Sequence, residues 1–481
     1  DHLIATARIV LLAGRGDIGS QLRALGTPAR LEKTPAGKAP AFAPSVMPAI
    51  PDLEFFNGTG GFDDEGREYV TVLTKGKTTP APWINVIANP HFGFQVSAEG
   101  SGFVWSENSR ENQLTPWSND QVTDPPGEVI YLCDLATDHV WTPTALPIRG
   151  QGTYIARHGF GYSTFLHTAN DIASEMTQFV PLEGSVKVTR LTLRNTGQTR
   201  RTLNVTAYAE WTLGSSRTNT SEHIQTWNDP TTGALLARNT FTTAFPGRVA
   251  FADLGGQTDS LTADRAEFIG IGGTLESPAG IGSNALSGRT GAGLDPCAAL
   301  RRNVTVNPGA TVEILFLLGE ADSAEAASAL IKRTRGEDAA RTLASVRQFW
   351  ADQLTAVQIT SPDRAMDIML NGWLLYQTLT CRIWARAGFY QASGAYGFRD
   401  QLQDGMALTF SRPDLTREHL LRAASRQFPE GDVQHWWLPH SGQGVRTRIS
   451  DDRVWLGYAV AQYISVSGDT GILDEQWPFL H

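Results

Sequence analysis

The stretch Val186-Lys-Val-Thr-Arg-Leu-Thr-Leu193 decides the fold of the larger part of this 481-residue chain. Val186 and Val188 alternate with polar residues, and Leu191 and Leu193 do the same one residue out of phase. Alternation with a period of two predicts a β-strand with one buried face, and the change of phase suits a β-bulge.

Similar runs of β-branched and aromatic residues recur on both sides of this stretch, separated by Gly, Asn, Asp and Pro turns. Tyr69-Val-Thr-Val-Leu73 and Leu203-Asn-Val-Thr-Ala-Tyr-Ala209 are two examples. So many strands without interleaved helices predict a large β-sandwich over residues 51–320. Residues 1–50 predict a leading amphipathic helix over 2–25, followed by an extended linker rich in Pro and Ala.

The sequence pattern becomes helical after Glu320. Ala324–Thr334 and Ala339–Leu354 are rich in Ala, Leu, Arg and Glu, which predicts a helical linker over residues 321–361. Ser361-Pro362-Asp363 predicts the start of the next helix, with Ser361 as N-cap and Pro362 at the first helical position. Residues 362–481 therefore form a helical domain, and the fold class is multidomain β plus α. Further helices are expected at Gln401–Phe410, Leu415–Phe428 and Arg453–Ser465.

Composition excludes several classes of protein. Lys and Arg number 40 against 49 Asp and Glu, a net charge of −9, so we expect no nucleic-acid partner. We find no apolar run approaching the roughly 18 residues that a membrane span requires. The three cysteines, Cys133, Cys297 and Cys381, lie far apart, which is neither a disulfide framework nor a zinc ligand set. We therefore expect a reducing compartment, the cytoplasm.

The densest polar cluster lies in Gly394-Ala-Tyr-Gly-Phe-Arg-Asp-Gln-Leu-Gln-Asp404. Asp400 and Asp404 share a face if a helix begins there, with Gln403 beside them. Arg399 next to Asp400 can grip vicinal sugar hydroxyls, because the guanidinium donates and the carboxylate accepts. The alternative is a helix cap with a local salt bridge.

The second cluster combines His435-Trp-Trp-Leu-Pro-His440 with Arg448 and Ser450-Asp-Asp452 in a Gly-containing loop. Trp436 or Trp437 can stack on a pyranose while Arg448 and Asp451 bind hydroxyls. The alternatives are core packing for the tryptophans and a helix cap for Asp451 and Asp452. The two histidines lack a third ligand at suitable spacing, so we predict no metal site.

A third cluster, Trp105-Ser-Glu-Asn-Ser-Arg-Glu-Asn-Gln-Leu-Thr-Pro-Trp-Ser-Asn-Asp120, lies within the predicted sandwich. Such a polar loop around two tryptophans can reach a sugar site on another domain or subunit, or pack on itself as a surface loop. The glycine-rich Phe55-Phe-Asn-Gly-Thr-Gly-Gly-Phe62 lacks the Lys of a phosphate loop, which argues against a nucleotide site.

Together these stretches resemble glycoside hydrolase family 94. The resemblance rests on residues 55–62, the Asn108-Ser-Arg-Glu-Asn112 loop, Tyr396–Asp404 and Arg446-Thr-Arg-Ile-Ser-Asp-Asp452. That family holds cellobiose and chitobiose phosphorylases, β-1,2-oligoglucan phosphorylases and the C-terminal region of cyclic β-1,2-glucan synthases. The β-1,2-glucan members show the strongest likeness.

The resemblance implies a β-sandwich, a helical linker and an (α/α)₆ barrel. It also implies inverting phosphorolysis of β-1,2-glucan, with inorganic phosphate as co-substrate and no cofactor. Arg399 and Asp400 would hold the sugar in the donor subsite, and Gln403, Asp404, Arg448, Asp451 and Asp452 would support it. Members often form a homodimer in which a sandwich loop covers the neighbour's site, and the parent enzyme is expected at the inner membrane.

Two departures from the family pattern matter. A further arginine that precedes the Arg-Asp pair in cellobiose-type members is replaced here by the Ser393-Gly394 region, which argues against a cellobiose-type site. The family's general acid lies in an Asp-Trp-Asn-Asp-like motif beyond Ser450-Asp-Asp452, and no match occurs before His481. We therefore expect a fragment of a longer polypeptide, with an incomplete barrel and no catalytic acid, inactive by itself. The alternatives are a catalytically silent carbohydrate-binding or assembly module, or an inverting glycoside hydrolase that uses Asp400 or Asp404 with Asp451 or Asp452.

Overall fold

The computed structural model describes residues 17–24, 50–282 and 284–480. Within the first range, helix α2 spans Ile18–Ala24. The rest of the leading helix predicted over residues 2–25, and the predicted linker up to residue 49, lie outside the described residues.

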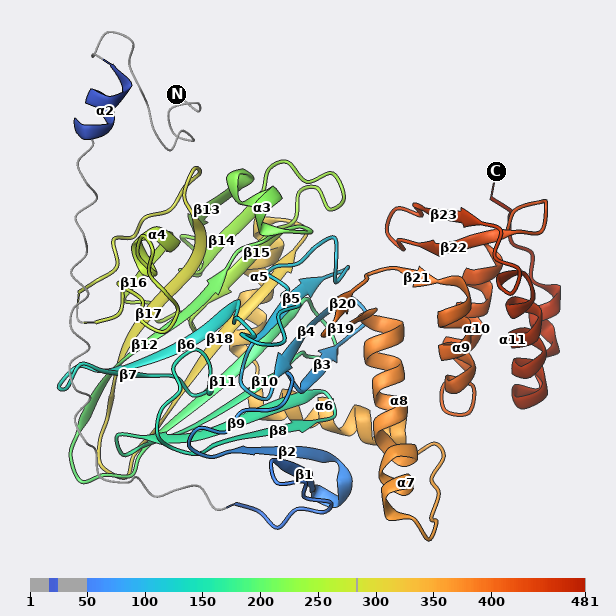
Figure 1. Ribbon diagram of the computed structural model, residues 1–481, viewed down its shortest axis with the longest axis horizontal. Helices are drawn as coiled ribbons and strands as arrows, with labels where there is room; N and C mark the ends of the chain where they lie inside the picture. Colours follow the sequence, from blue (N-terminus) through green and yellow to red (C-terminus); the bar gives the residue numbers. More distant parts are fainter. Residues whose placement is uncertain (1–16, 25–49, 283, 481) are drawn as a thin grey trace.

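A ten-stranded antiparallel sheet dominates the first part of the chain (Figure 1). From one edge, the first six strands follow the order of the chain. The remaining four strands follow the reverse order. In spatial order its strands are β1 (Gly60–Asp63), β2 (Glu68–Leu73), β8 (Tyr154–Gly159), β9 (Tyr162–Ala169), β10 (Ile172–Phe179), β11 (Val186–Asn195), β18 (Thr311–Ala321), β15 (Val249–Asp253), β14 (Leu235–Asn239) and β13 (Ile224–Asn228).

Two smaller sheets complete the sandwich. The five-stranded sheet packs Val205 and Ala207 against Leu191 and Leu193 of the large sheet, in one apolar core. Its strands are β16 (Ser260–Asp264), β17 (Pro296–Val306), β12 (Arg201–Glu210), β6 (Glu128–Asp134) and β7 (His139–Trp141). A three-stranded sheet holds β3 (Ile84–Ala88), β4 (Phe92–Ser97) and β5 (Gly102–Ser106), and the short helices of this part are η1 (Asp64–Gly66), α3 (Arg217–Thr220), η2 (Ser221–His223) and α4 (Arg265–Phe268).

Strand β11 has no bulge and is buried on both faces, so the predicted bulge and single buried face were wrong. Its register with both β10 and β18 runs without a shift. Leu191 and Leu193 face the core between the sheets, whereas Val186 and Val188 face a second core on the opposite side. The apolar pattern changes phase because the two ends of one regular strand are buried on opposite faces.

Helices cover that opposite face of the large sheet. Helix α5 (Ala324–Gly336) contributes Ala327 and Ile331 to the second core, and α6 (Ala339–Leu354) contributes Val346, Trp350 and Leu354. A long helical segment follows, made of α7 (Arg364–Ile368), π-helical η3 (Met369–Trp373), α8 (Leu374–Gln377) and π-helical η4 (Thr378–Trp384).

The start of that segment differs from the prediction. Asp363, not Ser361, is the N-cap, because its carboxylate accepts from the backbone N–H groups of Ala365 and Met366. A carboxylate accepts from these free donors, and the positive end of the helix dipole stabilises its negative charge. Ser361 instead forms a local turn with the backbone of Asp363.

Residues 396–480, here called the C-terminal lobe, lie beside the sandwich and are joined to it through α8 and the hairpin of β19 (Ala387–Gly388) and β20 (Gln391–Ala392) (Figure 1). Their core gathers Tyr396, Phe398, Leu402, Trp437 and Tyr463. The predicted loop around His435 is a β-hairpin in the structure, paired with the strand that precedes α9. The elements are β19 (Ala387–Gly388), β20 (Gln391–Ala392), β21 (Tyr396–Gly397), α9 (Phe398–Leu408), α10 (Pro413–Ala424), β22 (Val433–Trp437), β23 (Gly444–Thr447), α11 (Asp452–Ser467) and η5 (Thr470–Asp474).

The predicted fold class, a large β-sandwich followed by helices, is confirmed. Across the parts of the chain that the structure describes, no helix has the length and apolar character needed to cross a membrane.

Candidate functional site

The segment that leads into α9 places the first polar cluster. Gly394 adopts a left-handed conformation with φ of +61°, which a residue with a side chain rarely adopts. Tyr396 and Gly397 then pair with Trp437 and Trp436 of β22. Helix α9 begins at Phe398, so Arg399 and Asp400 lie in its first turn, where the helix dipole favours a carboxylate.

Arg399 joins the two clusters that the sequence analysis singled out. Its Nη1 donates to Oδ2 of Asp451 at 3.1 Å, across 52 residues of sequence. Its Nε and Nη2 each lie 3.4 Å from Oδ1 of Asp400. The hydrogen bond from Arg399 holds the pKa of Asp451 below its usual value, so this carboxylate is an acceptor at neutral pH.

These three side chains lie on an open surface. The side chains of Arg399 and Asp451 are 42% and 43% exposed, and that of Asp400 is 52% exposed. A guanidinium between two carboxylates offers donors and acceptors together, which is what adjacent sugar hydroxyls require.

Asp404 lies one turn further along α9 and binds a different arginine. Nε of Arg382, from η4, donates to its Oδ2 at 2.9 Å. Burial raises the pKa of Asp404, and Arg382 opposes that shift. Gln403 lies exposed on the same helix, so α9 carries all four predicted residues of the first cluster.

The two tryptophans of β22 divide between core and surface. Trp437 is 0% exposed and its ring packs against Tyr396 with centroids 5.7 Å apart. No face of Trp437 is available to a sugar, which corrects that part of the prediction. Trp436 is half-buried and is the tryptophan of this pair that retains an accessible surface.

The second acidic residue at the start of α11 is buried. Asp452 accepts from Nδ1 of His435 at 2.8 Å, and its other oxygen, Oδ1, has no partner among the described residues. Arg448 is exposed on the chain between β23 and α11. Within residues 17–24, 50–282 and 284–480, no group of three or more His, Cys, Asp or Glu side chains is arranged to hold a metal ion.

The sandwich reaches this region through the predicted polar loop after β5. Nδ2 of Asn108 donates to the carbonyl oxygen of Gly394 at 2.8 Å, and Nε1 of Trp117 donates to that of Phe389 at 3.1 Å. Phe245 of the sandwich also packs on His440, at the tip of the β22–β23 hairpin, with ring centroids 4.6 Å apart. The loop therefore contacts the other domain within the same chain.

Sequence reasoning missed Arg382 and Arg386. Arg386 is buried, and its Nε donates to the carbonyl oxygen of Gly394 at 3.0 Å. Both arginines lie at the end of an apolar helix before a glycine-containing segment, where cations that bind carbonyl oxygens are common. That signal is too general to have identified them.

A cavity of about 670 Å³ lies elsewhere, between η1, α6 and α7. Phe160, Tyr162, Trp350, Arg347 and Arg364 are among the residues that line it. None of the predicted sugar-binding residues lines this cavity.

Comparisons with known proteins place both parts of the chain. The glycosyl hydrolase 94 supersandwich domain matches residues 67–337, and the catalytic domain of the glycosyl hydrolase 94 superfamily matches residues 349–481. The chain is 44% identical to the cyclic β-(1,2)-glucan synthase NdvB of Rhizobium meliloti (strain 1021), over 99% of this chain and 17% of that protein. It is 26% identical to the N,N′-diacetylchitobiose phosphorylase of Vibrio furnissii, over 87% of this chain and 56% of the relative.

The fold is similar to that of a solved bacterial glucoamylase in complex with acarbose. That likeness has a TM-score of 0.52 at 10% identity, and covers 82% of this chain and 59% of the other. The chain thus spans about half the length of the phosphorylase relative and a smaller share of the glucan synthase.

Proposed function

Since the chain belongs to the glycosyl hydrolase 94 family, we propose that it carries the sugar-binding side of an inverting glycoside phosphorylase acting on β-1,2-glucan. One observation supports this above the others: Arg399 is held between Asp400 and Asp451 on an exposed face. Two motifs distant in sequence meet there with complementary charges and accessible polar atoms.

In the proposed reaction, an oxygen of inorganic phosphate forms a bond to the anomeric carbon of the terminal glucosyl unit. The glycosidic C–O bond breaks, and a carboxylic acid protonates the departing oxygen. The products are α-glucose 1-phosphate and a glucan shorter by one unit. No cofactor takes part.

Within this proposal, Arg399 and Asp400 clasp the glucosyl ring while Asp451 fixes the guanidinium. Gln403, Asp404, Arg448 and Asp452 support this subsite, and Trp436 offers an apolar edge. We assign no proton donor in this chain, and propose that the longer polypeptide supplies it.

The β-1,2 linkage is part of the proposal. The identity of 44% to a cyclic β-(1,2)-glucan synthase, over 99% of this chain, favours that linkage over the chitobiose of the 26% identical relative.

The test measures phosphate-dependent release of α-glucose 1-phosphate from oligomers of the sophorose series. It uses this chain and a longer polypeptide that continues past His481, with binding followed by calorimetry. Arg399→Ala is expected to weaken oligomer binding about 100-fold, because it removes charge-assisted donors. Arg333→Ala, at a 53% exposed arginine of α5, is the matched control and should bind normally.

Two other outcomes would replace the proposal. Reducing sugar released without phosphate, by either polypeptide, would indicate a glycoside hydrolase. Binding without release by the longer polypeptide would indicate a carbohydrate-binding module.

Two further parts of the proposal concern the molecule as a whole. We propose a cytoplasmic location, supported by Cys133, Cys297 and Cys381, which are all free thiols in the structure. We also propose a homodimer, which light scattering of the purified chain tests directly.

A further inference from the structure

We propose that Asn108 and Ser109 are positioning residues through which the sandwich fixes the sugar-binding residues Arg399 and Asp400. They belong to residues 106–112, here called the clamp loop. This inference rests on the proposed function, because it assigns a purpose to a contact between the sandwich and the sugar-binding segment.

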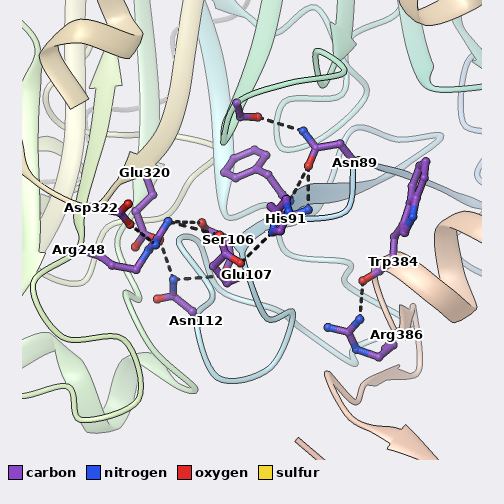
Figure 2. Close-up of polar contacts among 12 residues, drawn as sticks. Asn89, His91, Ser106, Glu107, Asn112, Arg248, Glu320, Asp322, Trp384 and Arg386 are labelled. Carbon is purple, nitrogen blue, oxygen red and sulfur yellow. Dashed lines mark hydrogen bonds and ion pairs between the residues drawn. The ribbon is translucent and has the colours of Figure 1, made fainter. Parts of the chain in front are cut away.

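The clamp loop is anchored firmly to the sandwich. Nδ2 of Asn112 donates to Oε2 of Glu320 at 2.8 Å, and Glu320 is a buried residue near the end of β18. Arg248, just before β15, binds Glu320 and also lies 3.7 Å from Oε1 of Glu107. Figure 2 shows Glu320, Asp322 and Arg248 beside Ser106, Glu107 and Asn112 of the loop. A network of hydrogen bonds and ion pairs around the buried Glu320 carboxylate restricts motion.

The other side of the loop grips the segment that leads to α9. Nδ2 of Asn108 donates to the Gly394 carbonyl oxygen at 2.8 Å, and Oγ of Ser109 donates to the Ala385 carbonyl oxygen at 2.7 Å. Both side chains are 0% exposed. Oδ1 of Asn108 accepts from the backbone N–H groups of Arg110 and Glu111 at 3.1 and 3.0 Å, which fixes the orientation of the amide.

The carbonyl group of Gly394 is one of the points where the two domains meet. It accepts from Asn108 of the sandwich and from Arg386 of the helical part. A Cβ atom at Gly394 would lie 2.1 Å from Oδ1 of Asn108, so the close approach requires glycine. The guanidinium of Arg386 also stacks over Tyr396, 4.7 Å from its ring centroid.

Only four residues separate Gly394 from Arg399, and two of them, Tyr396 and Gly397, are held in β21. A shift of Gly394 is therefore transmitted to the first turn of α9. The contact thereby couples the rigid sandwich to the orientation of the Arg399 guanidinium.

The test compares Asn108→Asp, Ser109→Ala and the control Arg110→Ala in this chain. Asn108→Asp keeps the oxygen that accepts within the loop and removes the donor to Gly394. Arg110 lies on the same loop with a 56% exposed side chain. Hydrogen exchange of residues 385–402, calorimetric binding of sophorose-series oligomers and thermal denaturation are measured for each variant.

For Asn108→Asp we expect at least about tenfold faster exchange in residues 394–402 and at least about tenfold weaker oligomer binding, because the donor to the Gly394 carbonyl is replaced by a carboxylate oxygen that repels it. Ser109→Ala should change both in the same direction and by less. Arg110→Ala should leave exchange and binding unchanged, and exchange in α10 should stay normal in all three.

A uniform rise in exchange across both domains would show a merely structural role and overturn the inference. So would normal exchange in residues 394–402 together with normal binding. If the unaltered chain fails to bind the oligomers, the proposed function fails, while local exchange still decides whether the clamp loop positions α9.

Discussion

The sandwich and the C-terminal lobe differ in how completely they cover their apolar residues. The ten-stranded sheet has buried cores on both faces, with Leu193 on one side and Val186 on the other. In the lobe, α11 buries Ala459 and Tyr463 but leaves Val454 65% exposed. Among the described residues, the large sheet is covered on both faces, whereas α11 carries apolar side chains on an uncovered face.

This difference indicates that the candidate site obtains its rigidity from the sandwich. Arg399, Asp400 and Asp451 all lie on the lobe, which has the smaller core. Their segment is bound to the sandwich through Asn108 and Ser109. Hydrogen bonds to the sandwich thus hold the geometry of a site that lies on the less covered lobe.

The largest expected effect comes from shortening a buried side chain in the core of the sandwich. Leu193→Ala at a 0% exposed position should lower the free energy of unfolding by about 3 kcal/mol, because it removes buried methyl groups and leaves a void. Urea denaturation followed by tryptophan fluorescence measures the change. Val454→Ala, at a 65% exposed position of α11, is the control and should change it by less than about 0.5 kcal/mol. A loss of similar size in both would contradict the comparison.

An intermediate effect is expected where the two regions meet. Gly394→Ala adds a Cβ atom 2.1 Å from Asn108 Oδ1 at a residue with φ of +61°. It should lower the free energy of unfolding by about 2 kcal/mol. It should also split thermal unfolding into two steps, measured by calorimetry, because the lobe loses its support. Gly431→Ala has φ of +83° and open space around its Cβ position. This control should show the backbone strain alone, and a single unfolding step.

The smallest effect expected of a single residue concerns pH. Burial lowers the pKa of His158 and His167 in the sandwich to about 4, and that of His419 in the lobe to about 3. These histidines stay neutral when folded and gain protons when unfolded, so their stabilisation is present above the unfolded pKa near 6.5 and falls as pH decreases from there. Each histidine should lower the free energy of unfolding by about 1 kcal/mol as the pH falls from 6.5 to 5.5.

Urea denaturation at several pH values measures this slope. His419→Gln should remove the contribution of His419 and leave those of His158 and His167. An unchanged slope in that variant would show that His419 does not titrate in this way.

Local patterns in the sequence predicted the class of each half of the chain, the longer helices after Glu320 and the strands named from their alternation. Helix α6 has the bounds that its composition suggested, and the alternating runs became strands. The failures came where distant residues decide the outcome. The phase change in β11 reflected a second core rather than a bulge, and the predicted loop at His435 became a hairpin because Tyr396 and Gly397 pair with it.

The candidate site divides in the same way. Residue type and spacing suggested Arg399, Asp400 and Asp451, because guanidinium and carboxylate groups near glycines suit hydroxyl binding. The sequence could not show that Arg399 contacts Asp451, that Trp437 is buried, or that Arg386 and Asn108 share the carbonyl group of Gly394.

The order of sandwich and helices and the candidate polar residues follow from the sequence, because apolar periodicity and side-chain chemistry are local properties. Tertiary structure alone decided which candidates meet, which tryptophan is accessible and what supports α9. These depend on contacts between segments up to 286 residues apart, as between Asn108 and Gly394, and no local pattern records a contact over that separation.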